Sequence, residues 1–247
     1  MNELKYRPEF LSVLANYKLS PVAMDILRRT RLVLLAGPTS SGRNTIINEL
    51  IKTGDYYHIV SDTTRLIRVK DGLPTEENGR EYWFRSEQEM LAGLRRGQYI
   101  EAAIIHNQQV SGCNYRELAK AIVAKKIAIK DIEQVGAQTI HELYPDATII
   151  FIIPPSFEAW MKRLRGRGDL PADEIQRRLI SAREELTAAL EHNYYRFVIN
   201  ENIIDTVAEV SAIAGFGLPD LITQRRSRQL AERLNLATKN YLLSKET

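Results

Sequence analysis

The sequence predicts an α/β protein with a parallel core sheet and helices on both of its faces, which gives three layers. Several apolar, β-branched runs have the length and composition of buried strands. Segments with helical spacing separate them, and this alternation is typical of parallel sheets, whose neighbouring strands need a crossover connection. The predicted core strands lie at residues 32–35, 127–132, 148–153 and 196–199.

The first thirty residues predict two short helices ahead of the first strand. Pro8 fits the first turn of one helix, with the apolar face Phe10, Leu11, Leu14 and Tyr17. Ser20 and Pro21 form an N-cap and a first helical position for the next, which runs to about residue 29. We expect this extension to pack either on the main domain or against a second subunit. The second alternative would make the protein a homodimer formed through its terminal extensions.

The remaining elements follow in order. A helix over 46–51 follows the first strand, and 57–61 is a short strand. The segment from 57 to about 112 is rich in turn signals and aromatic residues, which predicts a small mixed-sheet subdomain with strands at 82–84 and 98–105. Further helices are predicted at 115–125, 136–143, from 156, at 172–191 and at 204–213.

Beyond residue 215 the chain has apolar residues at helical spacing beside several arginines. Leu230, Leu234, Ala237 and Tyr241 share one face, which predicts an amphipathic helix docked on the body. A basic arm for nucleic acid or membrane is the less favoured reading, because basic helices have many uses.

Composition restricts the partners and the compartment. The chain has 247 residues, is 44% hydrophobic and carries a net charge of +3, so nucleic acid is not an expected partner. No apolar stretch approaches the roughly 20 residues of a membrane span, and no secretion-signal layout opens the chain. The single cysteine, Cys113, cannot form an internal disulfide, and we expect a cytoplasmic protein.

A glycine-bounded loop lies between the first strand and its helix. The spacing from Gly37 to Gly42 is that of a Walker A loop, in which backbone N–H groups and a helix N-terminus hold phosphate. Lys and then Ser or Thr normally follow the second glycine, but Arg43 and Asn44 stand there. The loop therefore predicts a P-loop fold with a changed pair of side chains.

Further residues suited to phosphate and to a base follow in the mixed-sheet segment. Arg65 and Arg68 present forked donors for phosphate oxygens, and Tyr82 adds a hydroxyl after a tight turn. Glu101 lies in an otherwise apolar strand, so it must face solvent or a donor-rich ligand, and a guanine edge is such a ligand.

With these residues in order, residues 31 to 213 resemble the guanylate kinase family. The motifs are the loop 37–45, S-x-T-T-R-x-x-R at 61–68, N-G-x-x-Y at 78–82, Tyr99-Ile100-Glu101, and 131–136 for the family's D-I-D-x-Q-G. The lid pattern appears at 154–156, 163–168 and 177–179, and Ile199-Asn200-Glu201 takes the place of V-N-D. The resemblance implies transfer of a phosphoryl group from ATP, with Mg²⁺, to GMP.

The resemblance also implies which residues do the work. The catalytic set is Arg43, Arg163, Arg167 and Arg178. The ATP-binding set is Gly37, Pro38, Thr39, Ser40, Ser41, Gly42, Arg43, Asn44, Thr45 and Asn200, with Asn44 as the protein ligand of Mg²⁺. The GMP-binding set is Ser61, Arg65, Arg68, Tyr82, Glu101, Ser111, Cys113, Asp131 and Glu133.

The changed positions leave two alternatives to an ordinary guanylate kinase. Arg43 keeps the positive charge but is bulkier than Lys, and Asn44 lacks the hydroxyl that usually ligates Mg²⁺, with Thr45 adjoining as a substitute. A catalytically impaired module that binds GMP or a protein partner is one alternative. A kinase with a shifted acceptor is the other, because Ser111 and Cys113 replace the family's Y-G-[ST] residues.

The predicted organisation has three parts: an N-terminal helical extension at 1–30, a guanylate kinase-like domain at 31–214 and a basic helical tail at 215–247. Within the middle part, a GMP-binding subdomain covers about 57–112 and an Arg-rich lid about 164–177.

Overall fold

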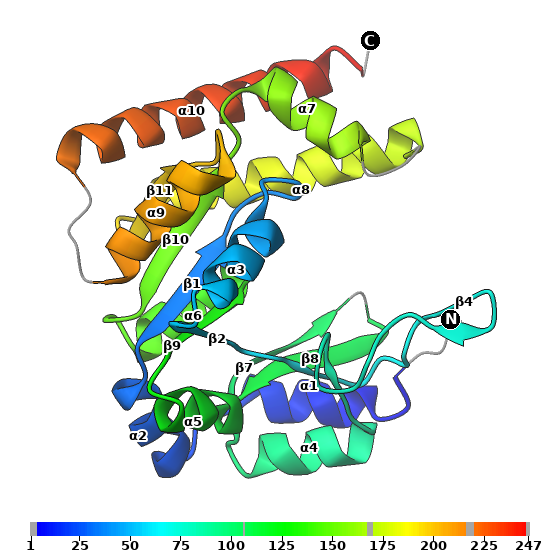
Figure 1. Cartoon of the computed structure of the whole chain (residues 1–247). Coiled ribbons are helices and arrows are strands. Elements are labelled where there is room, and N and C mark those ends of the chain that lie inside the picture. The colour runs from blue at the N-terminus through cyan, green and yellow to red at the C-terminus, as the bar shows by residue number, and fades with distance from the viewer. Residues whose placement is uncertain (1–3, 106, 167–169, 216–219, 246–247) are drawn as a thin grey trace. The chain divides into compact units, whose positions relative to one another are not determined.

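A computed structural model describes residues 4–105, 107–166, 170–215 and 220–245 (Figure 1). The chain forms two compact units. The first takes in Tyr57–Ala128, the described residues up to Arg31 and the short segment Glu142–Pro145. The second takes in Leu32–Tyr56, Ile129–His141 and the described residues from Asp146 onward.

The second unit is built around a parallel sheet. The five strands lie in the order β11-β10-β1-β9-β2, and β2 and β9 carry the chain between the units. Their bounds are β1 Leu32–Ala36, β2 Tyr56–His58, β9 Ile127–Asp131, β10 Thr148–Ile153 and β11 Tyr195–Ile199. Strand β1 is buried along its whole length and pairs in parallel with β10, from Val33 opposite Thr148 to Ala36 opposite Phe151. Burial on both faces explains its continuous apolar sequence.

Helices surround this sheet. They are α3 Arg43–Lys52, α6 Gln134–Leu143, α7 Phe157–Arg165, α8 Ala172–Glu191, α9 Ile203–Ala214 and α10 Leu221–Leu243. Helix α3 packs on α9, and α10 runs along α8 (Figure 1). The predicted helix at 172–191 has the bounds of α8, and the tail helix is present as α10.

The first unit has a smaller mixed sheet of its own, in the order β6-β3-β8-β7. These strands are β3 Asp62–Thr63, β6 Trp83–Phe84, β7 Tyr99–Ile105 and β8 Gln109–Asn114, with a separate hairpin of β4 Val69–Lys70 and β5 Leu73–Pro74. Its helices are α1 Arg7–Ala15, α2 Pro21–Arg29, α4 Glu87–Arg95 and α5 Tyr115–Val123. The predicted α/β class, with a parallel core sheet and a separate mixed sheet, is confirmed.

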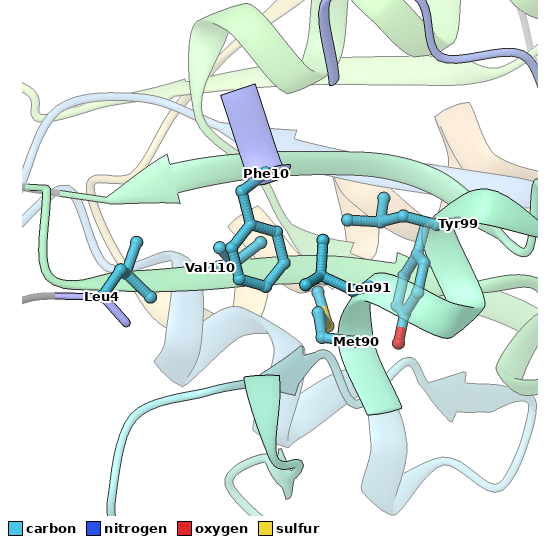
Figure 2. Packing of buried hydrophobic residues seen from close by; sticks show 7 residues of the cluster. Leu4, Phe10, Met90, Leu91, Tyr99 and Val110 are labelled. Carbon is cyan, nitrogen blue, oxygen red and sulfur yellow. The ribbon is translucent and has the colours of Figure 1, made fainter. Parts of the chain in front are cut away.

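The N-terminal helix α1 contributes to the hydrophobic core of the first unit. Phe10 is fully buried and packs with Met90 and Leu91 of α4 and with Val110 of β8 (Figure 2). Leu4, Leu94 and Tyr99 complete this cluster of buried residues. Residues that are distant in the sequence therefore share one core.

Helix α4 was not predicted from the sequence. Its signal is a capping box: the Ser86 hydroxyl accepts from the Glu89 N–H at 3.2 Å, and the Glu89 carboxylate accepts from the Ser86 N–H at 2.8 Å. The turn signals and aromatic residues of segment 57–112 predict only a mixed sheet there, so this helix is an addition to the prediction.

Candidate active site

The glycine-bounded loop connects β1 to α3 in the second unit, and both of its glycines are sterically required. Gly37 has φ +137° and Gly42 has φ +103°. A Cβ atom would lie 2.3 Å from the Ile152 carbonyl oxygen at Gly37 and 2.2 Å from Asn200 Nδ2 at Gly42. Ser40 between them also has a positive φ, of 63°, as do Asp71, Asn107 and Lys125 elsewhere in the described chain.

Two side chains from other elements hold the loop in place. Trp160 Nε1 of α7 donates to the Thr39 carbonyl at 2.8 Å. Asn200 Nδ2, just after β11, donates to the Ser41 carbonyl at 2.7 Å. These loop carbonyls are therefore bound to the protein, while the first N–H groups of α3 have no partner within their helix. This arrangement suits an anion.

The two serine hydroxyls of the loop indicate a ligand. Ser40 is 8% exposed and Ser41 1% exposed. Within the described part of the chain, neither Oγ atom has a hydrogen-bond partner. Buried hydroxyls are nearly always satisfied, so two orphans in one loop suggest a ligand that supplies the missing partners.

A hollow of about 300 Å³ lies beside this loop. The residues that line it are Ser40, Gly42, Thr45, Arg163, Asn200, Glu201 and Ile203. Arg163 Nη2 donates to the Asn200 carbonyl at 2.9 Å, which places a permanent positive charge at the hollow. The Asn200 Nδ2 group is held by the Ser41 carbonyl, and Asn200 Oδ1 lies 3.2 Å from Thr206 Oγ1, whose shortest hydrogen bond is to the Asn202 carbonyl at 2.6 Å.

The two changed loop residues do not line the hollow. Arg43 Nη1 donates to the Ile132 carbonyl at 3.3 Å, beyond the end of β9. Asn44 is exposed, whereas the neighbouring Thr45 lines the hollow. Of these three residues, only Thr45 therefore offers an oxygen to a ligand there.

Glu185 of α8 adds a carboxylate whose charge interacts with that of Arg43. The pKa of Glu185 is raised to about 7, mainly by burial; the charge of Arg43 opposes this rise, and those of Glu133 and Glu184 contribute to it. Sequence reasoning missed Glu185, because nothing in the helical pattern of α8 distinguishes it from the neighbouring Glu184.

The predicted lid arginines differ in their surroundings. Arg163 lines the hollow, as described. Arg178 Nε donates to Glu174 Oε1 at 2.7 Å, one turn away on the same helix, and this bond lowers the pKa of Glu174. Arg167 lies outside the described residues.

In the first unit, Glu76 organises the two predicted phosphate arginines. Arg65 donates from Nη1 to Glu76 Oε2 at 2.6 Å and from Nη2 to Oε1 at 2.8 Å, and its guanidinium lies 5.0 Å from the Tyr82 ring centroid. The Arg68 N–H donates to Glu76 Oε2 at 2.9 Å, and the Arg68 side chain is 73% exposed.

The hydrogen bond from Arg65 lowers the pKa of Glu76 to about 2, so this carboxylate stays ionised. The sequence contains Glu76 within a turn-rich stretch, which carries no signal for such a pairing.

The other predicted acceptor residues cluster on β3, β7 and β8. Glu101 of β7 lies directly opposite Cys113 of β8, and Cys113 is buried. The Ser111 hydroxyl donates to Thr63 Oγ1 at 2.9 Å. The Ser61 carbonyl accepts from the Trp83 N–H at 2.9 Å, just before β3.

The predicted GMP-binding set is divided between the units. Seven of its members belong to the first unit: Ser61, Arg65, Arg68, Tyr82, Glu101, Ser111 and Cys113. Asp131 and Glu133 are exposed residues of the second unit, at and just after the end of β9.

The helices and the possible metal ligands of the described residues were compared with what a membrane span and a metal site require. None of those helices is long and apolar enough to cross a membrane. No group of three or more His, Cys, Asp and Glu side chains there could hold a metal ion.

Comparisons with known proteins agree on one family. The family model for guanylate kinase matches residues 29–213. A guanylate kinase of Corynebacterium diphtheriae is 36% identical over 185 residues, which cover 74% of this chain and 93% of the relative. A guanylate kinase of Dechloromonas aromatica is 31% identical over 205 residues, covering 82% and 98% respectively.

A solved structure gives the same result. The crystal structure of guanylate kinase from Anaplasma phagocytophilum superposes with a TM-score of 0.56 at 25% identity, covering 82% of this chain and 93% of that one. Sequence and structure together show that this chain belongs to the guanylate kinase family.

Proposed function

We propose that the protein transfers the γ-phosphoryl group of ATP to GMP, giving ADP and GDP. The observation that carries this proposal is the pair of buried, unpartnered serine hydroxyls beside a hollow that also contains Arg163 and Asn200. A polyphosphate would supply the acceptors that both hydroxyls lack. The family membership adds GMP as the acceptor.

The donor nucleotide would occupy the second unit. Residues 37–45 hold the phosphates through the N-terminus of α3, and Asn200 keeps the loop in place. Arg163, Arg167 and Arg178 would neutralise the charge on the migrating phosphoryl group, which is the main catalytic requirement of phosphoryl transfer. Arg178 must first release Glu174, so its contribution depends on a movement of its side chain.

The acceptor would bind mainly to residues of the first unit. Arg65 and Arg68, organised by Glu76, supply forked donors for the GMP phosphate together with Tyr82. Glu101 would accept from the guanine N1–H and N2–H groups, next to Cys113. Ser61, Ser111, Asp131 and Glu133 complete the proposed acceptor set. In the reaction, a GMP phosphate oxygen forms the new bond to the γ-phosphorus while the bond to ADP breaks.

Mg²⁺ fits the oxygen donors of the hollow. This ion keeps several waters and binds mainly to nucleotide phosphates, so one or two protein oxygens are enough. Thr45 and Glu201 line the hollow and carry such oxygens, whereas Asn44, the ligand predicted from the sequence, is exposed outside it. When bound, the ion would neutralise phosphate charge.

The test is ADP formation in a coupled assay with ATP, Mg²⁺ and GMP. Turnover that requires GMP supports the proposal. Binding of GMP without turnover would instead support the catalytically impaired module, and faster turnover with dGMP, AMP, CMP or UMP would support a shifted acceptor. The relatives named guanylate kinase favour neither alternative.

Arg43 is the residue on which the activity of the variant loop depends. Arg43→Lys should keep kcat within about threefold, because the charge is retained, whereas Arg43→Ala should lower kcat about a hundredfold. A large loss in Arg43→Lys would contradict the conventional role and assign importance to the bond with the Ile132 carbonyl.

We also propose a cytoplasmic location, because a sequence with a single cysteine, Cys113, cannot form an internal disulfide and suits a reducing compartment.

A further inference from the structure

Helix α10 follows the region that the family model matches, which ends at residue 213. It packs on α8, on α7 and on β11 (Figure 1). Two of these elements border the nucleotide site, because α7 carries Arg163 and β11 leads to Asn200. The contacts of α10 with them therefore bear on the geometry of that site.

Gln224 attaches α10 to the edge of the core sheet. Its Oε1 accepts from the Phe197 N–H at 2.9 Å, and its Nε2 donates to the Phe197 carbonyl at 2.9 Å. β11 is the edge strand, and every second residue of an edge strand has both backbone groups facing outward. The side-chain amide has one donor end and one acceptor end, so it satisfies both groups of Phe197.

The strand continues from this anchor into the site. Three residues after Phe197, the Asn200 N–H donates to the Ile153 carbonyl at 2.8 Å. Asn200 then holds the Ser41 carbonyl through its side chain and accepts from Arg163 through its own carbonyl. A displacement of β11 would thus move a loop contact and an arginine contact together.

Tyr241 makes a second connection, through α7. Its ring lies 5.6 Å from the ring of Phe157, at the start of α7. Phe157 in turn packs edge-on against Trp160 at 6.1 Å, and the Trp160 indole holds the Thr39 carbonyl. α10 is therefore connected to both side chains that hold the loop carbonyls: to Trp160 through Phe157, and to Asn200 through β11.

We propose that α10 is a positioning element of the nucleotide site, and that Gln224 and Tyr241 are its positioning residues. They act through β11 and α7 on the loop 37–45, without contact to the nucleotide. The kinetic part of this inference rests on the proposed function, but its structural part does not.

The test uses six variants of the full chain, four at glutamine and asparagine positions and two at Tyr241. Gln224→Ala removes both bonds to Phe197, and Gln229→Ala is the matched control, because Gln229 is exposed on the same helix. Asn235→Ala removes a 3.1 Å bond from α10 to Thr187 of α8 and controls for general loosening of the helix. Gln224→Glu keeps the acceptor end and loses the donor end.

Two measurements are compared. Amide hydrogen exchange of the free protein should become about fivefold faster at 197–201 and 37–45 in Gln224→Ala, an intermediate amount in Gln224→Glu, and not in either control. In the coupled assay, KM for ATP should rise about fivefold in Gln224→Ala while kcat and KM for GMP stay within twofold. Tyr241→Leu should resemble Gln224→Ala, and Tyr241→Phe should behave like the wild type.

The outcomes separate the two proposals. Unchanged exchange at 197–201 and 37–45 in Gln224→Ala would overturn the positioning role, as would an equal effect in Asn235→Ala. A wild-type protein without turnover would contradict the proposed function alone, since the exchange measurement needs no substrate.

Discussion

Both units have an edge strand that is closed by one side chain from outside the region matched by the family model. In the first unit, the Tyr17 hydroxyl donates to the Tyr99 carbonyl at 2.6 Å and accepts from the Tyr99 N–H at 2.7 Å, on the edge strand β7. In the second unit, Gln224 does the same for Phe197 of β11. Residues 17 and 224 lie on either side of the matched region, 29–213.

The difference between the two lies in what surrounds the contact. Tyr17 packs against the hydrophobic cluster of Phe10 and Tyr99, and burial raises the pKa of Tyr17 to about 12. Gln224 is half-buried on a helix that also buries Ala231, Leu234 and Leu242, and whose Asn235 bonds to Thr187 of α8. Both extensions bury apolar residues, but the N-terminal one lies in the core of the first unit, whereas we propose that the C-terminal helix also supports the nucleotide site. We expect changes in the first to affect stability and changes in the second to affect nucleotide binding.

The largest effect is expected for Phe10→Ala. Removing a fully buried ring from the core of the first unit should lower the free energy of unfolding by about 4 kcal/mol. Denaturant unfolding measures it, with Leu11→Ala, at 47% exposure on the same helix, as the control that loses much less. A loss below about 1 kcal/mol would mean that α1 is not part of this core.

Glu76→Gln tests the charged part of the first unit and should cost about 3 kcal/mol at pH 7, because Arg65 would lose a bidentate, largely buried partner. The pKa of Glu76 lies at about 2 in the folded state, below its ordinary value of 4.5. Its contribution is therefore complete above pH 4.5 and is lost as the pH falls towards 2. Stability curves of wild type and variant should converge over that range, and parallel curves would contradict the pairing.

Tyr17→Phe compares the two edge closures directly. It leaves the Tyr99 N–H and carbonyl without their partner in a buried place, so we expect a loss of about 2 kcal/mol in unfolding free energy. Gln224→Ala should cost less, because the shortened side chain leaves room for water at Phe197, whereas the ring that Tyr17→Phe retains still covers Tyr99. Equal losses would remove the distinction between core and support.

The smallest effect concerns Glu185. The pKa of Glu185 is raised to about 7, so the folded state keeps a proton that the unfolded chain releases near pH 4.5. Wild-type stability should then fall as the pH rises from 4.5 to 7. Glu185→Gln should remove this fall and be about 1 kcal/mol more stable than wild type at pH 8, after solvent screening of a partly exposed side chain. Thermal unfolding at pH 5 and pH 8 measures it, and a constant difference between the two proteins would contradict the prediction.

The elements that the sequence predicted well are those with a strong local pattern. The continuous apolar run at 148–153 has the bounds of β10, and Ser20-Pro21 marks the start of α2. The phosphate loop was readable because Gly37 and Gly42 are required by backbone conformation, which local spacing reveals.

The interactions that the sequence did not predict join residues that are far apart in the chain and belong to no periodic pattern. Glu76 pairs with Arg65 across the β4–β5 hairpin. Tyr17 and Gln224 bond to backbone groups, and every residue type has these groups, so the identity of the partner residue does not indicate the bond. The hydrogen bond of the Arg43 side chain with the Ile132 carbonyl could not be predicted either, because the partner of a long, flexible side chain depends on which groups the fold brings near it.

The attachment of the loop by Trp160 and Asn200 has a kinetic consequence. Both bonds join protein groups, so no nucleotide atom is needed to hold these loop carbonyls. Association at such a preformed surface is expected to be a single bimolecular event, with an observed rate that rises linearly with ATP concentration instead of levelling off at an isomerisation rate. The phosphate-binding loop would then already have its binding conformation when ATP arrives, and any slower phase in the association kinetics would report a later step.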